Sequence, residues 1–184
     1  MNKFKILGIS GSLRKESYNL SLLKAAAKLL PPDVELEIVT LENLPIYNQD
    51  TENIINPAVD TFKKKIEEAD AILFSSPEYN YSIPGVLKNA IDVASRPWGK
   101  NSWTGKPAAI MGASIGALGT SRAQYHLRQV MVFLDMYPLN KPEVMVMTAQ
   151  EKINAAGEVT DEKTKEKISE LIVALVAWGK KLAK

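Results

Sequence analysis

The sequence contains no cysteine among its 184 residues. Disulfide bonds, thiolate nucleophiles, redox-active dithiols and zinc sites built from cysteine are therefore excluded. Any redox chemistry must come from a bound cofactor. Histidine is almost as scarce, because His126 is the only one. A metal site needs several ligands, so no metal centre is expected.

Charge of one sign and long apolar runs are also scarce. The 23 lysines and arginines are scattered among 21 acidic residues, and the net charge of +2 gives no reason to expect a nucleic-acid partner. The longest apolar run, residues 171–178, is far shorter than the roughly 20 residues that a membrane helix needs. Near the N-terminus we find no apolar signal segment. We therefore expect a cytoplasmic protein without a membrane partner.

The composition indicates one folded domain across residues 1–184. Hydrophobic residues make up 46% of the chain and charged residues 24%, and neither internal repeats nor low-complexity segments occur. A chain of this length can bury roughly two-thirds of the surface that it exposes when unfolded. One well-formed core is therefore expected.

Apolar periodicity predicts strands that alternate with helices. Short apolar runs indicate strands at 4–9, 34–41, 71–76, 106–113 and 143–148, and helical spacing indicates helices at 17–30, 57–69, 86–94, from 117 or 120 to about 136, and 160–181. This alternation is typical of an α/β fold, a doubly wound five-stranded parallel sheet with helices on both faces. The strand order 2-1-3-4-5 fits it best. In that order the loops after strands 1 and 3 lie side by side, where ligands bind.

The loop after the first predicted strand is rich in groups that bind anions. It offers free N–H groups at a helix start, together with polar side chains of Ser10, Ser12, Arg14, Ser17 and Asn19. Neither G-x-G-x-x-G nor G-x-x-x-x-G-K-[ST] occurs in the chain, which disfavours a Rossmann dinucleotide or a Walker-type triphosphate. A terminal monophosphate fits the loop better. The alternative is that Ser17 only caps the helix and nothing binds.

The loop after the third predicted strand carries two aromatic residues. Tyr79 and Tyr81 lie among polar groups within residues 77–85. A flat ring system would gain from their packing and from backbone N–H groups that face its polar edge. The alternative is that one or both tyrosines close the end of the core.

Residues 112–116, GASIG, match the G-x-S-x-G pattern of a hydrolase nucleophile elbow. That reaction needs an acid and a histidine beside the serine. The only histidine is His126, and no acidic residue lies between it and Ser114. A serine hydrolase is therefore disfavoured, and the glycines more simply let a flat ligand approach the backbone. For His126 we expect a role in packing or in a subunit contact.

Three segments resemble the NAD(P)H-dependent FMN reductases, especially their bacterial quinone and chromate reductase branch: GSLRKESYN at 11–19, PEYNYSIPGVLKNAID at 77–92 and SRAQYHLRQ at 121–129. The resemblance covers nearly the whole chain and implies a flavodoxin-like fold, FMN as cofactor and NADPH or NADH as co-substrate. It implies a small-molecule electron acceptor, such as a quinone, a flavin, an azo compound or chromate. One departure is Thr120, where the family often has the second glycine of a pair.

The same resemblance implies which residues hold FMN. Its phosphate would be held by Ser10, Ser12, Arg14, Ser17 and Asn19, with Leu13 in the same loop, while Pro77, Glu78, Tyr79, Asn80 and Tyr81 would border its ring and Ser114 and Gly116 would cover the other side. No catalytic side chain is expected, since the cofactor carries the chemistry. A flavodoxin-type electron carrier and a non-enzymatic flavin sensor are the competing hypotheses.

The resemblance further implies a homodimer or homotetramer with the flavin near a subunit interface. Candidate contact residues are Trp98, Trp103 and residues 125–134, which lie within the fourth predicted helix. The two tryptophans would equally suit the core.

Overall fold

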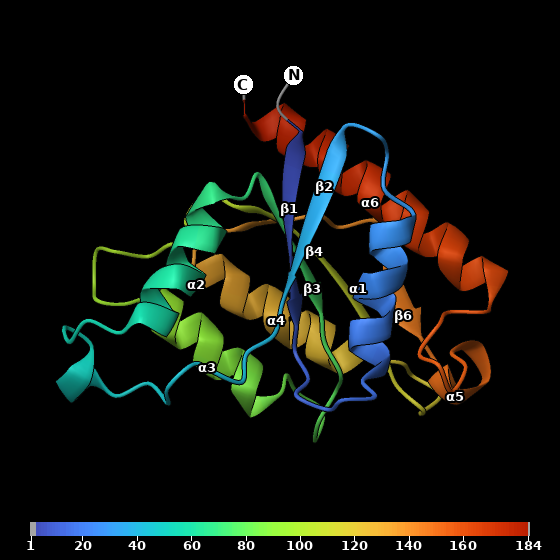
Figure 1. Cartoon of the computed structure of the whole chain (residues 1–184), viewed down its shortest axis with the longest axis horizontal. Coiled ribbons are helices and arrows are strands. Elements are labelled where there is room, and N and C mark those ends of the chain that lie inside the picture. The colour runs from blue at the N-terminus through green and yellow to red at the C-terminus, as the bar shows by residue number, and fades with distance from the viewer. Residues whose placement is uncertain (1–2, 184) are drawn as a thin grey trace.

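A computed structural model describes residues 3–183 as a parallel sheet between two layers of helices (Figure 1). The central strands are β1 (Phe4–Ser10), β3 (Ala71–Ser75) and β4 (Pro107–Ala113), and β2 (Val34–Val39) lies at one edge. The strand order is β2-β1-β3-β4-β5, and every pairing is parallel. The predicted order is confirmed.

The edge beyond β4 differs from the expected single fifth strand. Two short segments share it: β5 (Tyr137–Pro138) pairs with the start of β4, and β6 (Val144–Val146) pairs with its end. The N–H groups of Tyr137 and Leu139 donate to the carbonyls of Lys106 and Ala108, so Pro138 lies where its missing N–H faces away from β4 and costs no hydrogen bond. After Leu139 the chain leaves the sheet, and it returns at Val144.

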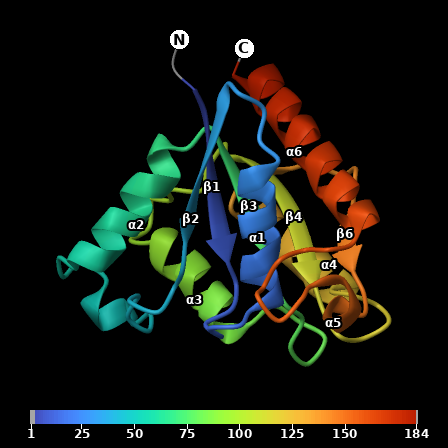
Figure 2. The ribbon, with the colours of Figure 1, turned by 45° about the vertical axis from the view of Figure 1, so that its right-hand side comes forward.

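Both faces of the sheet are covered, as Figure 2 shows for the helices on either side. Helices α1 (Tyr18–Lys28) and α6 (Glu162–Leu182) pack on one face, and α2 (Pro57–Glu68), α3 (Gly85–Ala94) and α4 (Ser121–Phe133) pack on the other. Neighbouring residues of β1 point to opposite cores, since Ile6 packs with α1 and α6 and Leu7 packs with the other layer. This two-sided burial explains why the central strands are continuous apolar runs.

Two short helical segments lie outside the predicted elements. A single turn of 3₁₀-helix, η1, spans Gln49–Thr51 in the loop after β2, and α5 (Ala149–Lys152) follows β6. Among the described residues, no helix is both long and apolar enough to cross a membrane.

Polar side chains fix where the helices begin. Ser17 accepts a hydrogen bond from the N–H of Leu20 and caps α1, and Asn56 caps α2 in the same way with Pro57 as the first helical residue. Asp161 caps α6, and its hydrogen bonds from the side chain and N–H of Thr164 hold the pKa of its carboxyl below the usual value. The starts of all three helices were predicted to within two residues.

Of the two tryptophans that are candidate contact residues, one lies in the core and one at the surface. Trp103 is fully buried, packs against Phe62 and Phe74, and donates its ring N–H to the carbonyl of Ile91. Trp98 is 78% exposed. Of the two, only Trp98 is available for a contact with another molecule.

Candidate functional site

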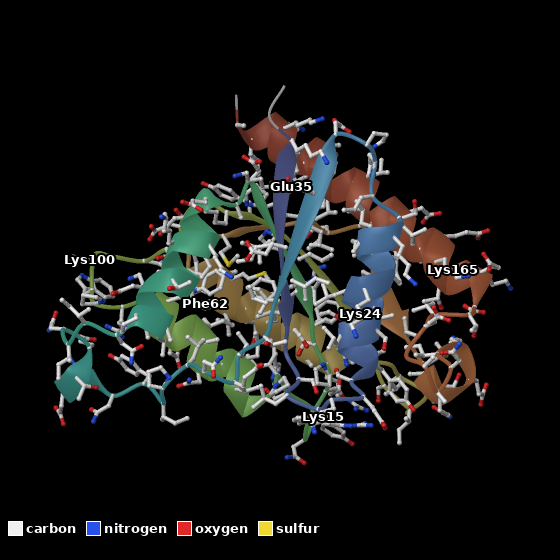
Figure 3. The ribbon with its side chains drawn as sticks, viewed as in Figure 1. Lys15, Lys24, Glu35, Phe62, Lys100 and Lys165 are labelled. Carbon is white, nitrogen blue, oxygen red and sulfur yellow. The ribbon has the colours of Figure 1, made fainter. Side chains whose placement is uncertain are left out.

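The loops after β1, β3 and β4 meet at the carboxyl edge of the sheet, where Figure 3 labels Lys15. Hydrogen bonds join the first two loops to the neighbouring strands: the N–H of Gly11 donates to the carbonyl of Ser75 in β3, and the N–H of Ser76 donates to the carbonyl of Met111 in β4. The helix after β1 covers one face of the sheet and the helix after β3 covers the other, so this edge is a topological switch point. The structure therefore brings the three sequence-predicted groups of residues together.

The loop after β1 is a cradle of free N–H groups. In the hydrogen bonding of residues 3–183, no protein acceptor takes the backbone N–H of Ser12, Leu13, Lys15 or Glu16. Gly11 lets the loop lie close to the next one, because a Cβ there would come within 2.9 Å of Ser76 Oγ. Several unpaired donors at a helix start suit a phosphate group.

The three serine hydroxyls of this loop differ in what they can offer. All three are buried. Ser10 donates to the carbonyl of Ser12 at 3.3 Å and so shapes the loop. Ser12 and Ser17 accept backbone N–H groups, from Arg14 and Leu20 respectively, which leaves their own O–H groups able to donate. Ser17 can thus cap α1 and still face an anion.

Arg14 is exposed, and its guanidinium carbon lies 5.8 Å from the centre of the Tyr18 ring. No carboxylate of the described residues pairs with it. Its donors therefore remain available for oxygen atoms of a ligand.

Asn19 has a role that the sequence did not indicate. Its side-chain oxygen accepts the N–H of Ala113 at 2.9 Å, and its amide nitrogen donates to the carbonyl of the same residue at 3.0 Å. The hydroxyl of Ser75 donates to the backbone carbonyl of Asn19. The residue thus joins the start of α1 to the ends of β3 and β4, and only one side-chain N–H is left for a phosphate.

The loop after β3 is a tight hairpin. Tyr79 and Ser82 exchange two backbone hydrogen bonds of 3.0 Å each, and Asn80 and Tyr81 between them have φ angles of 52° and 66°. Two consecutive positive φ angles are typical of a type I′ turn and are unfavourable for a tyrosine. Tyr79 is 47% exposed and Tyr81 is 65% exposed, so neither ring closes the core.

Helix α4 supports this hairpin. The Glu78 carboxylate accepts the N–H groups of Arg122 and Ala123 and forms an ion pair of 2.8 Å with the Arg122 guanidinium. That guanidinium lies 3.7 Å from the centre of the Tyr81 ring. Arg122 was not among the predicted site residues, because nothing in the sequence indicates a partner 44 residues away.

The loop after β4 does not form a hydrolase site. Ser114 Oγ accepts the N–H of Gly116 at 3.1 Å, whereas His126 Nδ1 lies 3.0 Å from Ser82 Oγ. The only histidine is thus engaged with the hairpin and not with Ser114. Thr120 is fully buried and accepts a hydrogen bond from Gln124, so its side chain packs inside the protein and does not line the surface.

Large apolar side chains stay exposed around the three loops. They are Leu13, Tyr79, Tyr81, Ile115, Leu118 and Met147, each at least 45% exposed. Exposed apolar side chains gathered at one edge mark a surface for an apolar ligand or partner. We call this set the apolar rim. Residues 3–183 hold no group of three or more histidine, aspartate or glutamate side chains placed to bind a metal ion.

The protein matches known sequences along most of its length. Residues 4–151 match the family model of the NADPH-dependent FMN reductases. An NAD(P)H-dependent FMN reductase of Pseudomonas aeruginosa is 52% identical over 97% of this chain and 96% of its own. An NAD(P)H:quinone oxidoreductase of Solanum tuberosum is 48% identical over 97% of this chain and 94% of its own.

A solved structure is similar over the whole fold. FerB of Paracoccus denitrificans, a flavoenzyme NAD(P)H:(acceptor) oxidoreductase, superposes with a TM-score of 0.88 at 40% identity and covers 96% of this chain and 97% of its own.

Proposed function

The chain belongs to the NADPH-dependent FMN reductase family, and from this we propose that it reduces quinones with NAD(P)H through FMN held at the carboxyl edge of its sheet. It is an oxidoreductase enzyme. Bound FMN supplies the redox chemistry, since it can take a hydride from NAD(P)H and pass two electrons to an acceptor. The chain's own residues bind and orient the reacting groups.

One observation carries the proposal: the free N–H groups of the loop after β1, which we call the anion cradle, lie at the same sheet edge as the apolar rim. The free N–H groups of Ser12, Leu13, Lys15 and Glu16, two serine hydroxyls and the Arg14 guanidinium suit a monophosphate. The rim suits a flat ring, and the N–H groups of Asn80 and Tyr81, which donate to no acceptor in residues 3–183, are free for its polar edge. FMN combines these two parts in one molecule, so the residues fit the cofactor that the family implies.

Residues of the hairpin and of the loop after β4 would enclose the ring between them. Pro77 to Tyr81 would border it, and Ser114 and Gly116 would cover its other side. Gly116 has no neighbouring side chain or backbone atom close to the position of an added Cβ except Ser114 Oγ at 3.6 Å, which leaves the backbone there open to a flat ligand. A quinone is the proposed acceptor because relatives from Solanum tuberosum and Burkholderia are named quinone reductases.

Anaerobic mixing with NADPH tests the reaction. The FMN-loaded protein should lose its visible flavin absorption when NADPH is added, and a quinone added afterwards should restore it. NADH in a parallel experiment gives the coenzyme preference. A protein that binds FMN but stays oxidised with both coenzymes would be an electron carrier or a sensor, and this proposal would be wrong.

We also propose that the protein works in the cytoplasm. There it would form a homodimer through the outer side of α4. Tyr125, Val132 and Phe133 lie on that side and are 56%, 76% and 76% exposed. Their spacing of seven and eight residues makes an apolar stripe along the helix. Such a stripe is typical of a helix that packs against a partner.

Replacing Phe133 with lysine should shift the protein from dimer to monomer, because a charge would have to be buried at the interface. Light scattering after size-exclusion chromatography measures the mass. Val173→Lys is the matched control, since Val173 is 56% exposed on α6 at the opposite face of the sheet and its replacement should leave the mass unchanged. An unchanged mass for Phe133→Lys would contradict an interface at this position.

A further inference from the structure

Helix α4 takes its N-terminal cap from the ring-bordering hairpin. Thr120 occupies the N-cap position but forms no capping hydrogen bond, and the first turn has no acidic residue. The hydroxyl of Thr120 accepts Gln124 Nε2 instead. The free N–H groups of Arg122 and Ala123 donate to the Glu78 carboxylate at 3.0 and 3.1 Å. Glu78, in the proposed ligand loop, thus caps the N-terminus of α4, a role that a side chain at the N-cap position usually has.

The Glu78 carboxylate is almost enclosed. Its side chain is 9% exposed and its second oxygen pairs with Arg122 Nη1 at 2.8 Å. A nearly buried carboxylate that accepts three hydrogen bonds is held in one conformation, because breaking these bonds would leave a buried charge without partners. The end of β3 and the start of α4 are therefore held at a fixed distance.

The hairpin needs this support. Tyr81 has a φ angle of 66°, which is unfavourable for a residue with a bulky side chain, whereas asparagine tolerates the positive φ angle of Asn80. Two further contacts with α4 hold it: the Arg122 guanidinium over the Tyr81 ring and the pair formed by His126 and Ser82. An unfavourable backbone conformation persists only when its surroundings enforce it.

We propose that Glu78 is a positioning residue for the ring of the bound flavin. By capping α4 and orienting Arg122, it keeps the hairpin in the conformation that presents the free N–H groups of Asn80 and Tyr81 and the ring of Tyr81 to the ligand. This inference rests on the proposed function, in which the hairpin borders the FMN ring. It assigns no contact of the Glu78 carboxylate with the flavin itself.

Glu78→Gln tests the inference, since glutamine keeps the size of the side chain and loses its charge. We measure the affinities for FMN and for riboflavin, which lacks the phosphate, by quenching of flavin fluorescence at a temperature where circular dichroism shows a folded protein. Both affinities should fall about tenfold, which corresponds to about 1.4 kcal/mol, while their ratio stays that of the wild type. Hydrogen exchange of residues 78–82 should become faster in the flavin-free variant.

Glu143→Gln is the matched control. Glu143 is also partly buried beside α4, where it accepts a hydrogen bond from Tyr125 and pairs with Lys141, and in residues 3–183 it forms no hydrogen bond or ion pair with the hairpin. Its replacement should change neither flavin affinity. Arg122→Lys is a second test if Glu78→Gln does not fold, because lysine keeps the charge but cannot stack a planar guanidinium on Tyr81. It should weaken FMN and riboflavin equally.

The outcomes separate this inference from the proposed function. Wild-type affinities in a folded Glu78→Gln variant would overturn the positioning role. Glu78 would then only cap helix α4. A change in the ratio of the two affinities would also overturn it, because the effect would then lie at the phosphate. A wild-type protein that binds neither flavin would overturn the proposed function itself.

Discussion

Replacing Gly112 with alanine should destabilise the protein by about 3 kcal/mol, at the upper end of the usual cost of overpacking a core, and should abolish flavin binding. Gly112 lies in β4 and is buried. An added Cβ would overlap Thr120 Oγ1 and the backbone carbonyl oxygen of Ser76. The carbonyl cannot rotate away as a flexible side chain could, so the backbone itself must shift.

The same clash explains the expected loss of binding. Ser76 begins the loop after β3, and Thr120 ends the loop after β4, so the added methyl group would push apart the two loops that we propose to enclose the ring. Thr120 has no room to move, because it is fully buried and bonded to Gln124.

Urea denaturation and a flavin titration measure the two effects of Gly112→Ala. Gly85→Ala is the control: nothing lies within 4 Å of an added Cβ there, and alanine is a better helix former than glycine at the start of α3. The control should be as stable as the wild type or slightly more stable. A stability of Gly112→Ala within about 0.5 kcal/mol of the wild type, the usual range of neutral surface changes, would show that the two loops can yield.

The order of the strands could be predicted because buried strands and amphipathic helices leave different patterns. The central strands β1, β3 and β4 are apolar on both sides, and the helices carry one apolar side each. The split edge formed by β5 and β6 could not be predicted in this way. A strand of two residues that includes Pro138 is too short for any periodicity.

The place of the candidate site could be predicted from topology, but the hydrogen-bond partners of individual side chains could not. Parallel strands bring their carboxyl ends to one edge whatever the loops contain. Asn19 bonds to Ala113, 94 residues away, and Glu78 bonds to Arg122, 44 residues away. A single sequence carries no sign of such pairs, so it predicts only that Asn19 holds the phosphate and that Glu78 borders the ring.

Arg14 is the residue on which discrimination between FMN and riboflavin should depend most. Its guanidinium is exposed, has no carboxylate partner in residues 3–183 and extends from the loop whose N–H groups form the anion cradle. A hydrogen bond between charged groups contributes about 1.5–3 kcal/mol. Solvent screens an exposed pair, so we take the lower limit and expect Arg14→Ala to weaken FMN about tenfold.

Riboflavin makes the test specific. Because it lacks the phosphate, its affinity should be the same for Arg14→Ala and for the wild type, and the preference for FMN should shrink by the same factor of about ten. The difference should also diminish as salt is added, since exposed charges are screened over about 10 Å at 0.1 M ionic strength. Glu78→Gln should behave in the opposite way and weaken both flavins together.

Lys24→Ala is the matched control for charge. Lys24 lies further along α1, on its exposed side, and is labelled away from the loop edge in Figure 3. Its removal changes the net charge of the protein as much as Arg14→Ala does, so any general electrostatic effect appears in both. An unchanged preference for FMN in Arg14→Ala would mean that the backbone N–H groups and the hydroxyls of Ser12 and Ser17 hold the phosphate without the guanidinium, as a helix start with several free donors can.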